Sequence, residues 1–135
     1  MKRLFSTRYS AGAFNTALFL LRFIAGFLMI HHGYDKLVHF AEYKDQFIDF
    51  MGLGKSISLS LTIFAEFFCS LFIMLGLFTR LAAIPLIITM CVVLFKINHA
   101  DFYDKGELPV MYIAAFLTIL IVGPGRASID SMIGK

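Results

Sequence analysis

Two charged residues lie inside apolar stretches of this sequence, and they are the first candidates for chemistry. Arg22 interrupts an apolar run over residues 14–33, and Glu66 lies within another run over residues 57–78. A charge at the centre of a hydrocarbon layer costs roughly 3 kcal/mol on insertion scales, so such residues are rare and usually functional. Arg22 and Glu66 are therefore the candidate residues for a polar core that could bind a ligand.

Helical spacing predicts that both charges face the protein interior. Arg22 shares one side of a helix with small and polar residues, namely Asn15, Gly26 and Gly33. Glu66 continues a four-residue spacing of hydroxyl-bearing residues, namely Ser58, Thr62 and Ser70. Residues of these kinds line helix–helix contacts in membranes. An Arg22–Glu66 ion pair is therefore expected, and it could either fix helix register or hold a proton or a ligand head group.

A second polar group is expected at one mouth of the bundle. It contains four candidate binding residues, which are His32, Lys36, His99 and Glu107. Histidines near one face suggest a metal or a haem, but the HxxxH and HExxH spacings of histidine metal sites do not occur. A metal site is therefore not predicted, and haem ranks below a quinone or substrate contact.

The composition indicates which solvent surrounds the chain. Its 135 residues are 59% hydrophobic and 16% charged, with a mean hydropathy of +0.82. A soluble domain has about 25% charged residues, so this chain has too few to cover a surface that faces water. The net charge of +3 is scattered, which argues against nucleic acid binding. Cys69 and Cys91 lie in apolar runs, and we read them as small buried residues. A lipid bilayer is the expected partner.

Four apolar runs predict four transmembrane helices, over about residues 14–33, 57–78, 81–97 and 108–122. About 20 residues cross roughly 30 Å of hydrocarbon, and a helix satisfies its own backbone groups there. We therefore predict an all-α fold, an integral membrane four-helix bundle that forms a single domain over residues 1–135.

The connection over residues 34–56 is predicted to be amphipathic rather than a plain loop. Phe40, Tyr43 and Phe47 recur at helical spacing among charged residues, and the stretch ends near Gly52 and Gly54. It could cover the mouth of the bundle as a lid, or it could dock a partner protein.

An even number of spans places both termini on one side of the membrane. Lys2, Arg3 and Arg8 precede the first span, and basic residues favour the cytoplasmic side. Both termini are therefore expected in the cytoplasm. The first span lacks a small-residue cleavage site, so we expect it to be retained rather than removed as a signal peptide.

Several motifs in this sequence resemble the DoxX family. The stretch LLRFIAGFLMIHHGYDKL looks like that family's leucine-arginine pair followed by a histidine-glycine-x-x-lysine-leucine exit. Glu66 followed by LGLFTRLAA, then GELPVMYIAAF and the ending GPGRASID, are similar to its later segments. The matching positions are Arg22, His32, Gly33, Lys36, Glu66, Arg80, His99, Glu107, Gly123, Gly125, Arg126, Ser128 and Asp130.

This resemblance implies a protein of the bacterial inner membrane that is linked to redox chemistry. Some DoxX relatives are subunits of a thiosulfate:quinone oxidoreductase, and others belong to oxidoreductase complexes for thiol and peroxide defence. The resemblance thus points to a redox partner subunit, while the cofactor stays open, with a quinone as a candidate ahead of haem. A nucleotide fingerprint, a CxxC pair and a flavin motif are missing from the sequence. Whether the chain is catalytic or accessory therefore stays open, as does a homo-oligomer.

Two other functions remain open at this point. The chain could be a carrier or binding protein for a small solute or lipid that uses Arg22 and Glu66. It could also be a non-catalytic membrane adaptor that docks a partner through residues 34–56.

The GPGRASID ending has a structural interpretation of its own. Gly123 and Gly125 can adopt the positive φ that ends a helix, and Pro124 prevents its continuation. Ser128 and Asp130 are then expected to cap or tie down the tail. We expect this motif to be structural rather than part of a binding site.

Overall fold

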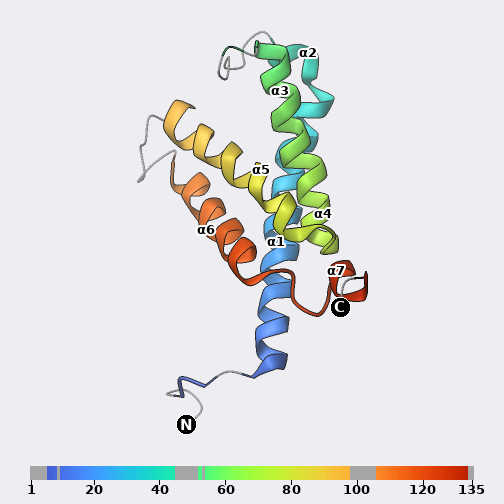
Figure 1. The fold of residues 1–135 in the computed structure, drawn as a ribbon. Coiled ribbons are helices and arrows are strands. Elements are labelled where there is room, and N and C mark those ends of the chain that lie inside the picture. The colour runs from blue at the N-terminus through green and yellow to red at the C-terminus, as the bar shows by residue number, and fades with distance from the viewer. Residues whose placement is uncertain (1–5, 9, 45–51, 53, 98–105, 134–135) are drawn as a thin grey trace.

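The computed structural model describes residues 6–8, 10–44, 52, 54–97 and 106–133, with the side chains of residues 96 and 97 left out. The described part of the chain is mostly helical and contains no strand (Figure 1). The predicted all-α fold is therefore confirmed, and each of the four predicted apolar spans corresponds to a helical run.

The first helix, α1, runs over Ala11–Val38 and is longer than the apolar run that predicted it. The Ser10 side chain caps its start by accepting a hydrogen bond from the Ala13 backbone N–H. Lys36 lies in its last turn, where a cation interacts favourably with the helix dipole. A short helix, α2, follows at Phe40–Tyr43. The predicted amphipathic segment is thus partly taken up by the end of α1, and residues 45–51 and 53 lie outside the described chain.

The second helical run is interrupted by a wider turn at its centre. It consists of α3 (Lys55–Ile63), the π-helical segment η3 (Phe64–Cys69) and α4 (Ser70–Leu75). Gly76 ends the run with a φ of 73°, which suits glycine. Short π-helical segments inside α-helices occur frequently at functional sites, and this one contains Glu66.

The remaining helices form the second half of the molecule. They are α5 (Thr79–Val92), continued by the π-helical segment η4 (Val93–Ile97), then α6 (Glu107–Val122) and α7 (Ile129–Ile133). Figure 1 shows α5 and α6 side by side, leaning away from α1 and α3 toward the end of the molecule that carries α2. We refer to this as the α2 end, and to the opposite end, near α7 and the first turn of α1, as the α7 end.

The helix contacts define one core. The α1 helix packs along α3, η3 and α4, while α5 packs against η3, α4 and α6, and α6 returns to α1. The core contains apolar side chains from every one of these runs, including Met29, Ile73, Leu86, Phe116 and Ile119.

Glycines set the close approach of α1 to the second helical run. A Cβ atom at Gly33 would lie 2.6 Å from the Phe67 backbone nitrogen, and one at Gly26 would lie 2.9 Å from the Ser70 carbonyl oxygen. Neither position could carry a larger side chain without a shift of backbone. The two contacts fix an antiparallel register in which Gly33 lies opposite Glu66.

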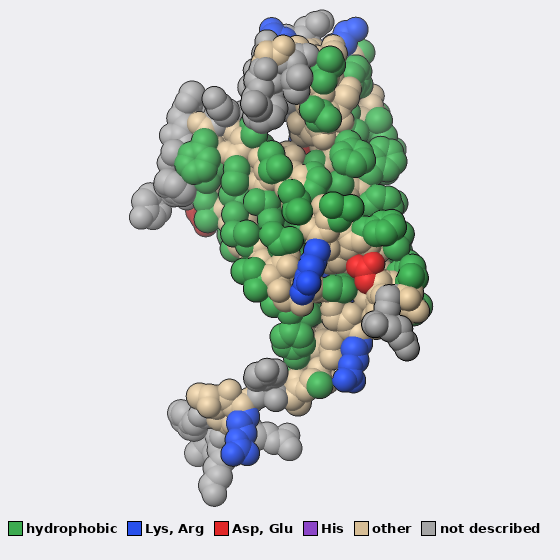
Figure 2. Space-filling model, viewed as in Figure 1, with side chains coloured by type: hydrophobic (Ala, Val, Ile, Leu, Met, Phe, Trp, Pro, Cys, Tyr) green, Lys and Arg blue, Asp and Glu red, His purple; other side chains and the backbone are tan. Residues whose placement is uncertain are grey.

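Much of the surface is apolar. Two helical runs, Ala11–Val38 and Lys55–Leu75, are long and apolar enough to cross a membrane, and α5 and α6 are shorter apolar helices. Only 28% of the most apolar window of the first run, and 44% of that of the second, is buried. A core helix of a soluble protein would be mostly buried. Figure 2 shows hydrophobic side chains over much of the visible face, with Lys and Arg side chains at both ends and one Lys or Arg side chain near the middle, beside an Asp or Glu side chain.

Candidate functional site

The centre of the candidate site is an ion pair between Lys36 and Glu66. The Lys36 ammonium donates a hydrogen bond to the Glu66 carboxylate at 2.7 Å. The Glu66 side chain is 2% exposed and that of Lys36 is 23% exposed, so the carboxylate is buried and the ammonium lies nearer the surface. The pair joins the last turn of α1 to η3, and the close contact at Gly33 brings these two elements together.

The predicted Arg22–Glu66 ion pair is wrong, although both side chains are buried as expected. The Arg22 guanidinium instead donates hydrogen bonds to backbone carbonyls of Ile73 (3.1 Å), Met74 (3.4 Å) and Ala127. The reason is the helix register, because the antiparallel packing places Arg22 opposite the end of α4. Glu66 lies seven residues before Ile73, which is roughly 10 Å along the helix axis.

A pocket of about 110 Å³ opens beside the ion pair. Its polar side is formed by Lys36, Glu66 and His32, and its other walls come from α1, α5, η4 and α6. The remaining lining residues are Met29, Met90, Val93, Leu108, Pro109 and Tyr112. A buried cavity of about 150 Å³ holds benzene, and this pocket, at about 110 Å³, is somewhat smaller.

Aromatic rings pack against one another along the side of this pocket formed by α1 and α6. The His32 ring meets the Tyr112 ring edge-on, with centroids 6.2 Å apart, and Tyr112 stacks on Phe116 at 5.8 Å. His32 is half-buried, whereas His31 is exposed. His32 is therefore the histidine that faces the site.

The predicted mouth residues are only partly brought together. His32 and Lys36 line the pocket with Glu66. Glu107 is exposed in the first turn of α6 and does not line it, although the next residue, Leu108, does. His99 lies outside the described residues. Among the described residues, no cluster of three or more histidine, cysteine, aspartate and glutamate side chains could hold a metal ion.

Sequence reasoning missed two features of the site. Lys36 was recognised as a candidate but not as the partner of Glu66, and Tyr112 was not singled out. A signal for Lys36 was present, because Arg22, Met29 and Lys36 recur every seven residues and so share one face of α1. Tyr112 carries no comparable signal, since α6 is apolar on all sides.

A small exposed cluster lies at the α2 end, next to the ion pair. The Tyr43 hydroxyl donates to the Asp35 carboxylate at 2.9 Å, and His39 Nδ1 lies 3.2 Å from the other carboxylate oxygen. Hydrogen bonding to the backbone carbonyl of Asp35 raises the pKa of His39, and the bond to the Asp35 carboxylate raises the pKa of Tyr43. This cluster supplies titratable groups at the surface near Lys36.

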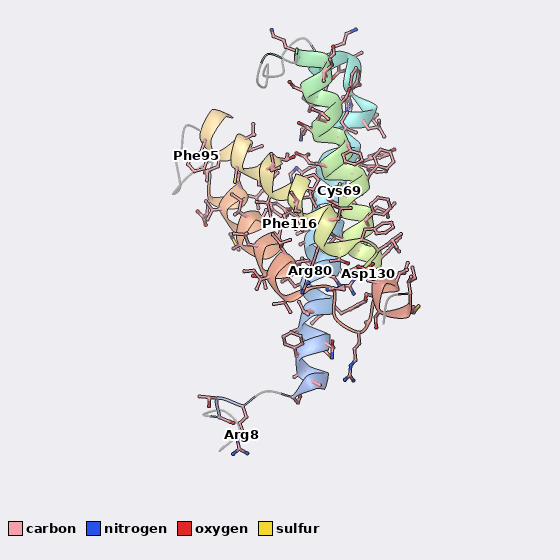
Figure 3. All side chains as sticks on the ribbon, viewed as in Figure 1. Arg8, Cys69, Arg80, Phe95, Phe116 and Asp130 are labelled. Atoms are coloured by element: carbon pink, nitrogen blue, oxygen red, sulfur yellow. The ribbon has the colours of Figure 1, made fainter. Side chains whose placement is uncertain are left out.

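The GPGRASID motif ties the α7 end together, which agrees with its predicted structural role. The Asp130 carboxylate accepts hydrogen bonds from the backbone N–H groups of Phe78 (2.8 Å) and Thr79 (2.9 Å), at the start of α5. The Asp130 N–H in turn donates to the Gly76 carbonyl at 2.8 Å. Figure 3 shows Asp130 at this end, with Arg80 nearby. Burial alone would raise the pKa of Asp130, but the hydrogen bonds from Thr79 and Phe78 outweigh it and the pKa is lowered.

Comparison with known proteins gives the chain its family. The DoxX family pattern matches residues 17–99, which include Arg22, Lys36 and Glu66. A protein of Haemophilus influenzae, described as uncharacterized, is 29% identical over 127 residues, covering 88% of this chain and 84% of the relative. No solved structure matches the chain. The family pattern extends over more than half of the sequence, and this chain therefore belongs to the DoxX family.

Proposed function

We propose that this DoxX protein is an integral membrane protein that binds the head group of a quinone at the Lys36–Glu66 pair and serves a redox-linked system. The observation that carries this proposal is an ion pair with a buried carboxylate that lines a small pocket beside it.

The membrane part of the proposal rests on surface and length. Large apolar side chains are exposed along every long helix, among them Phe27, Phe64, Leu81 and Ile121. The 16 residues of α6 extend over about 24 Å, close to the roughly 30 Å of hydrocarbon in a bilayer. The basic N-terminal segment favours the cytoplasmic side for both termini. Because the chain resembles DoxX relatives of the bacterial inner membrane, we place it in that membrane.

The pocket supplies the groups that quinone chemistry needs. The Lys36 ammonium can donate a hydrogen bond to a quinone carbonyl oxygen, and the rings of Tyr112 and His32 can pack against the quinone ring. Glu66 can pass a proton through its carboxyl group. Reduction of the quinone to the quinol takes two electrons and two protons. In this proposal a partner subunit that oxidises thiosulfate or a thiol supplies the electrons, and the protons enter from the α2 end.

The test is to purify the protein from its native membrane in mild detergent and to measure co-extracted quinone by mass spectrometry. A tailless benzoquinone is then titrated into the quinone-depleted protein, with tyrosine fluorescence as the signal. We expect binding to wild type, and binding at least about tenfold weaker for Lys36→Met and Glu66→Gln, because each substitution removes a charged hydrogen-bonding group.

Glu107→Gln is the matched control, because it makes the same change at an exposed carboxylate that does not line the pocket. It should bind like wild type. Protein that carries no quinone and shows no binding in the titration would overturn the proposal. Equal affinities of all four proteins would show that any quinone binds elsewhere.

A further inference from the structure

A second, larger hollow lies on the outer side of α1 and α6. It is a groove of about 380 Å³, and its α1 wall is formed by Leu20, Ile24 and Leu28 on the exposed side of that helix. Its α6 wall includes Met111 and Ala115, and the small side chains of Ala25 and Ala115 leave its floor open. Apart from Tyr112, every side chain that lines this groove is apolar.

The groove and the ion-pair pocket share two residues. Leu108 and Tyr112, on adjacent turns of α6, line both hollows. On α1, Leu28 lines the groove and the next residue, Met29, lines the pocket. The charged pocket and the apolar groove therefore lie next to each other. The residues they share, Leu108 and Tyr112 of α6, separate the two hollows.

We infer that the ligand of the Lys36–Glu66 site is a quinone with a long isoprenoid tail, whose ring lies in the pocket and whose tail passes Tyr112 into the α1–α6 groove. This inference rests on the proposed function and adds the substrate class and the direction of entry. A pocket of about 110 Å³ is too small for a tail of several isoprene units, so the tail must lie outside it. The groove is the adjoining apolar space, and it faces the lipid from which such a ligand would come.

The inference makes the tail, rather than the ring alone, a determinant of affinity. The test uses two probes with the same benzoquinone ring, one without a tail and one with a tail of several isoprene units, titrated into protein held in lipid nanodiscs. For wild type we expect the tailed probe, at equal mole fraction in lipid, to bind at least about tenfold more tightly. Burial of several CH₂ groups is more than sufficient for that ratio.

Two substitutions in the groove should remove this advantage. Ala115→Leu fills the floor of the groove, and Ile24→Ser makes its α1 wall polar. Each should weaken the tailed probe about tenfold and leave the tailless probe unchanged. The matched controls are Ala114→Leu, at an exposed neighbour on α6, and Ile88→Ser, at an isoleucine on α5 that is 51% exposed, compared with 53% for Ile24. Both controls should bind both probes like wild type.

The outcomes separate the two proposals. If the tailless probe binds wild type in a way that depends on Lys36, but the tail adds nothing and the groove variants behave like wild type, the tail inference is overturned and the proposed function stands. If neither probe binds, the proposed function fails, and the tail inference fails with it. If Ile24→Ser changes the oligomeric mass in native mass spectrometry and leaves the affinity for both probes unchanged, a second copy of the chain occupies the groove, and the tail inference is overturned.

Discussion

At the scale of single residues, the ion pair with Lys36 stabilises the buried carboxylate of Glu66. A carboxylate that is 2% exposed would be strongly destabilising without a counter-charge, and the 2.7 Å hydrogen bond from Lys36 provides it. Arg22 is equally buried, its two terminal nitrogens donate to backbone carbonyls while its Nε has no hydrogen-bond partner, and its guanidinium lies over the Phe19 ring, 5.6 Å from the centroid. The two buried charges thus have separate environments: Glu66 lines a pocket, whereas Arg22 is held by backbone carbonyls.

The dependence of Glu66 on Lys36 gives a prediction for stability. Lys36→Met leaves the carboxylate without its partner and should destabilise the protein by about 3 kcal/mol, whereas adding Glu66→Gln in the same chain should recover most of this loss. The thermal midpoint in detergent is the measurement. Strictly additive effects of the two substitutions would show that the pair is not coupled.

The exposed residue His31, next to the site, provides a comparison for the effect of Glu66 on quinone binding. His31→Ala should leave quinone binding and stability near wild type, because its side chain is exposed and lies outside the pocket. Glu66→Gln should weaken binding much more strongly. Equal and negligible effects of the two substitutions, measured by the same titration, would argue against a functional polar centre.

At the scale of the elements, the approach of α1 to η3 controls the geometry of the site. A Cβ atom at Gly33 would lie 2.7 Å from the Glu66 carbonyl carbon, so Gly33→Ala should push the two elements apart and lengthen the Lys36–Glu66 hydrogen bond. We expect a loss of roughly 1 to 3 kcal/mol in stability together with weaker quinone binding.

Gly12→Ala is the matched control, because a Cβ atom there would meet nothing within 4 Å. Alanine should stabilise this helical position slightly, since glycine costs up to about 1 kcal/mol in a helix. The thermal midpoints of the two variants should therefore move in opposite directions. Equal shifts would mean that Gly33 is not a contact point.

The C-terminal segment gives a prediction about pH. The pKa of Asp130 is lowered in the folded protein, so the stability from its cap on α5 is present above the unfolded pKa of about 4 and is lost as the pH falls through the folded value. Asp130→Asn should therefore be less stable than wild type near pH 7, and the difference should shrink in acid. Thermal midpoints of both proteins across the pH range test this, and a difference that is constant down to pH 3 would contradict it.

The sequence was sufficient for the elements but not for their register. Length and composition predicted four apolar helices, and each is present. Most of the helix ends lie within a few residues of the predicted ends. Helical spacing also predicted that the Arg22 and Glu66 side chains face the protein interior, where the structure places them. Their partners were not, because a shift of two turns between antiparallel helices exchanges one set of neighbours for another. The contact at Gly33 sets that shift.

At the scale of the whole molecule, the two ends have different roles. The α7 end is closed by hydrogen bonds that involve Arg22, Gly76 and Asp130. At the α2 end, α5 and α6 lean away from α1 and α3 (Figure 1). The Lys36–Glu66 pocket is lined by residues of α1, η3, α5, η4 and α6. A closed end that holds the helices together allows the other end to keep a pocket. A ligand and its protons would therefore reach the site from the α2 end or from the lipid.

The most direct measurement of the central claim is the infrared spectrum of a quinone labelled with ¹³C at its carbonyl groups, bound to the purified protein. If the Lys36 ammonium donates a hydrogen bond to one carbonyl, that carbonyl stretch shifts to lower frequency in wild type, and the shift disappears in Lys36→Met while Glu107→Gln retains it. A carbonyl stretch at the frequency of quinone dissolved in lipid, unchanged between wild type and Lys36→Met, would contradict the assignment of this ion pair as the quinone site.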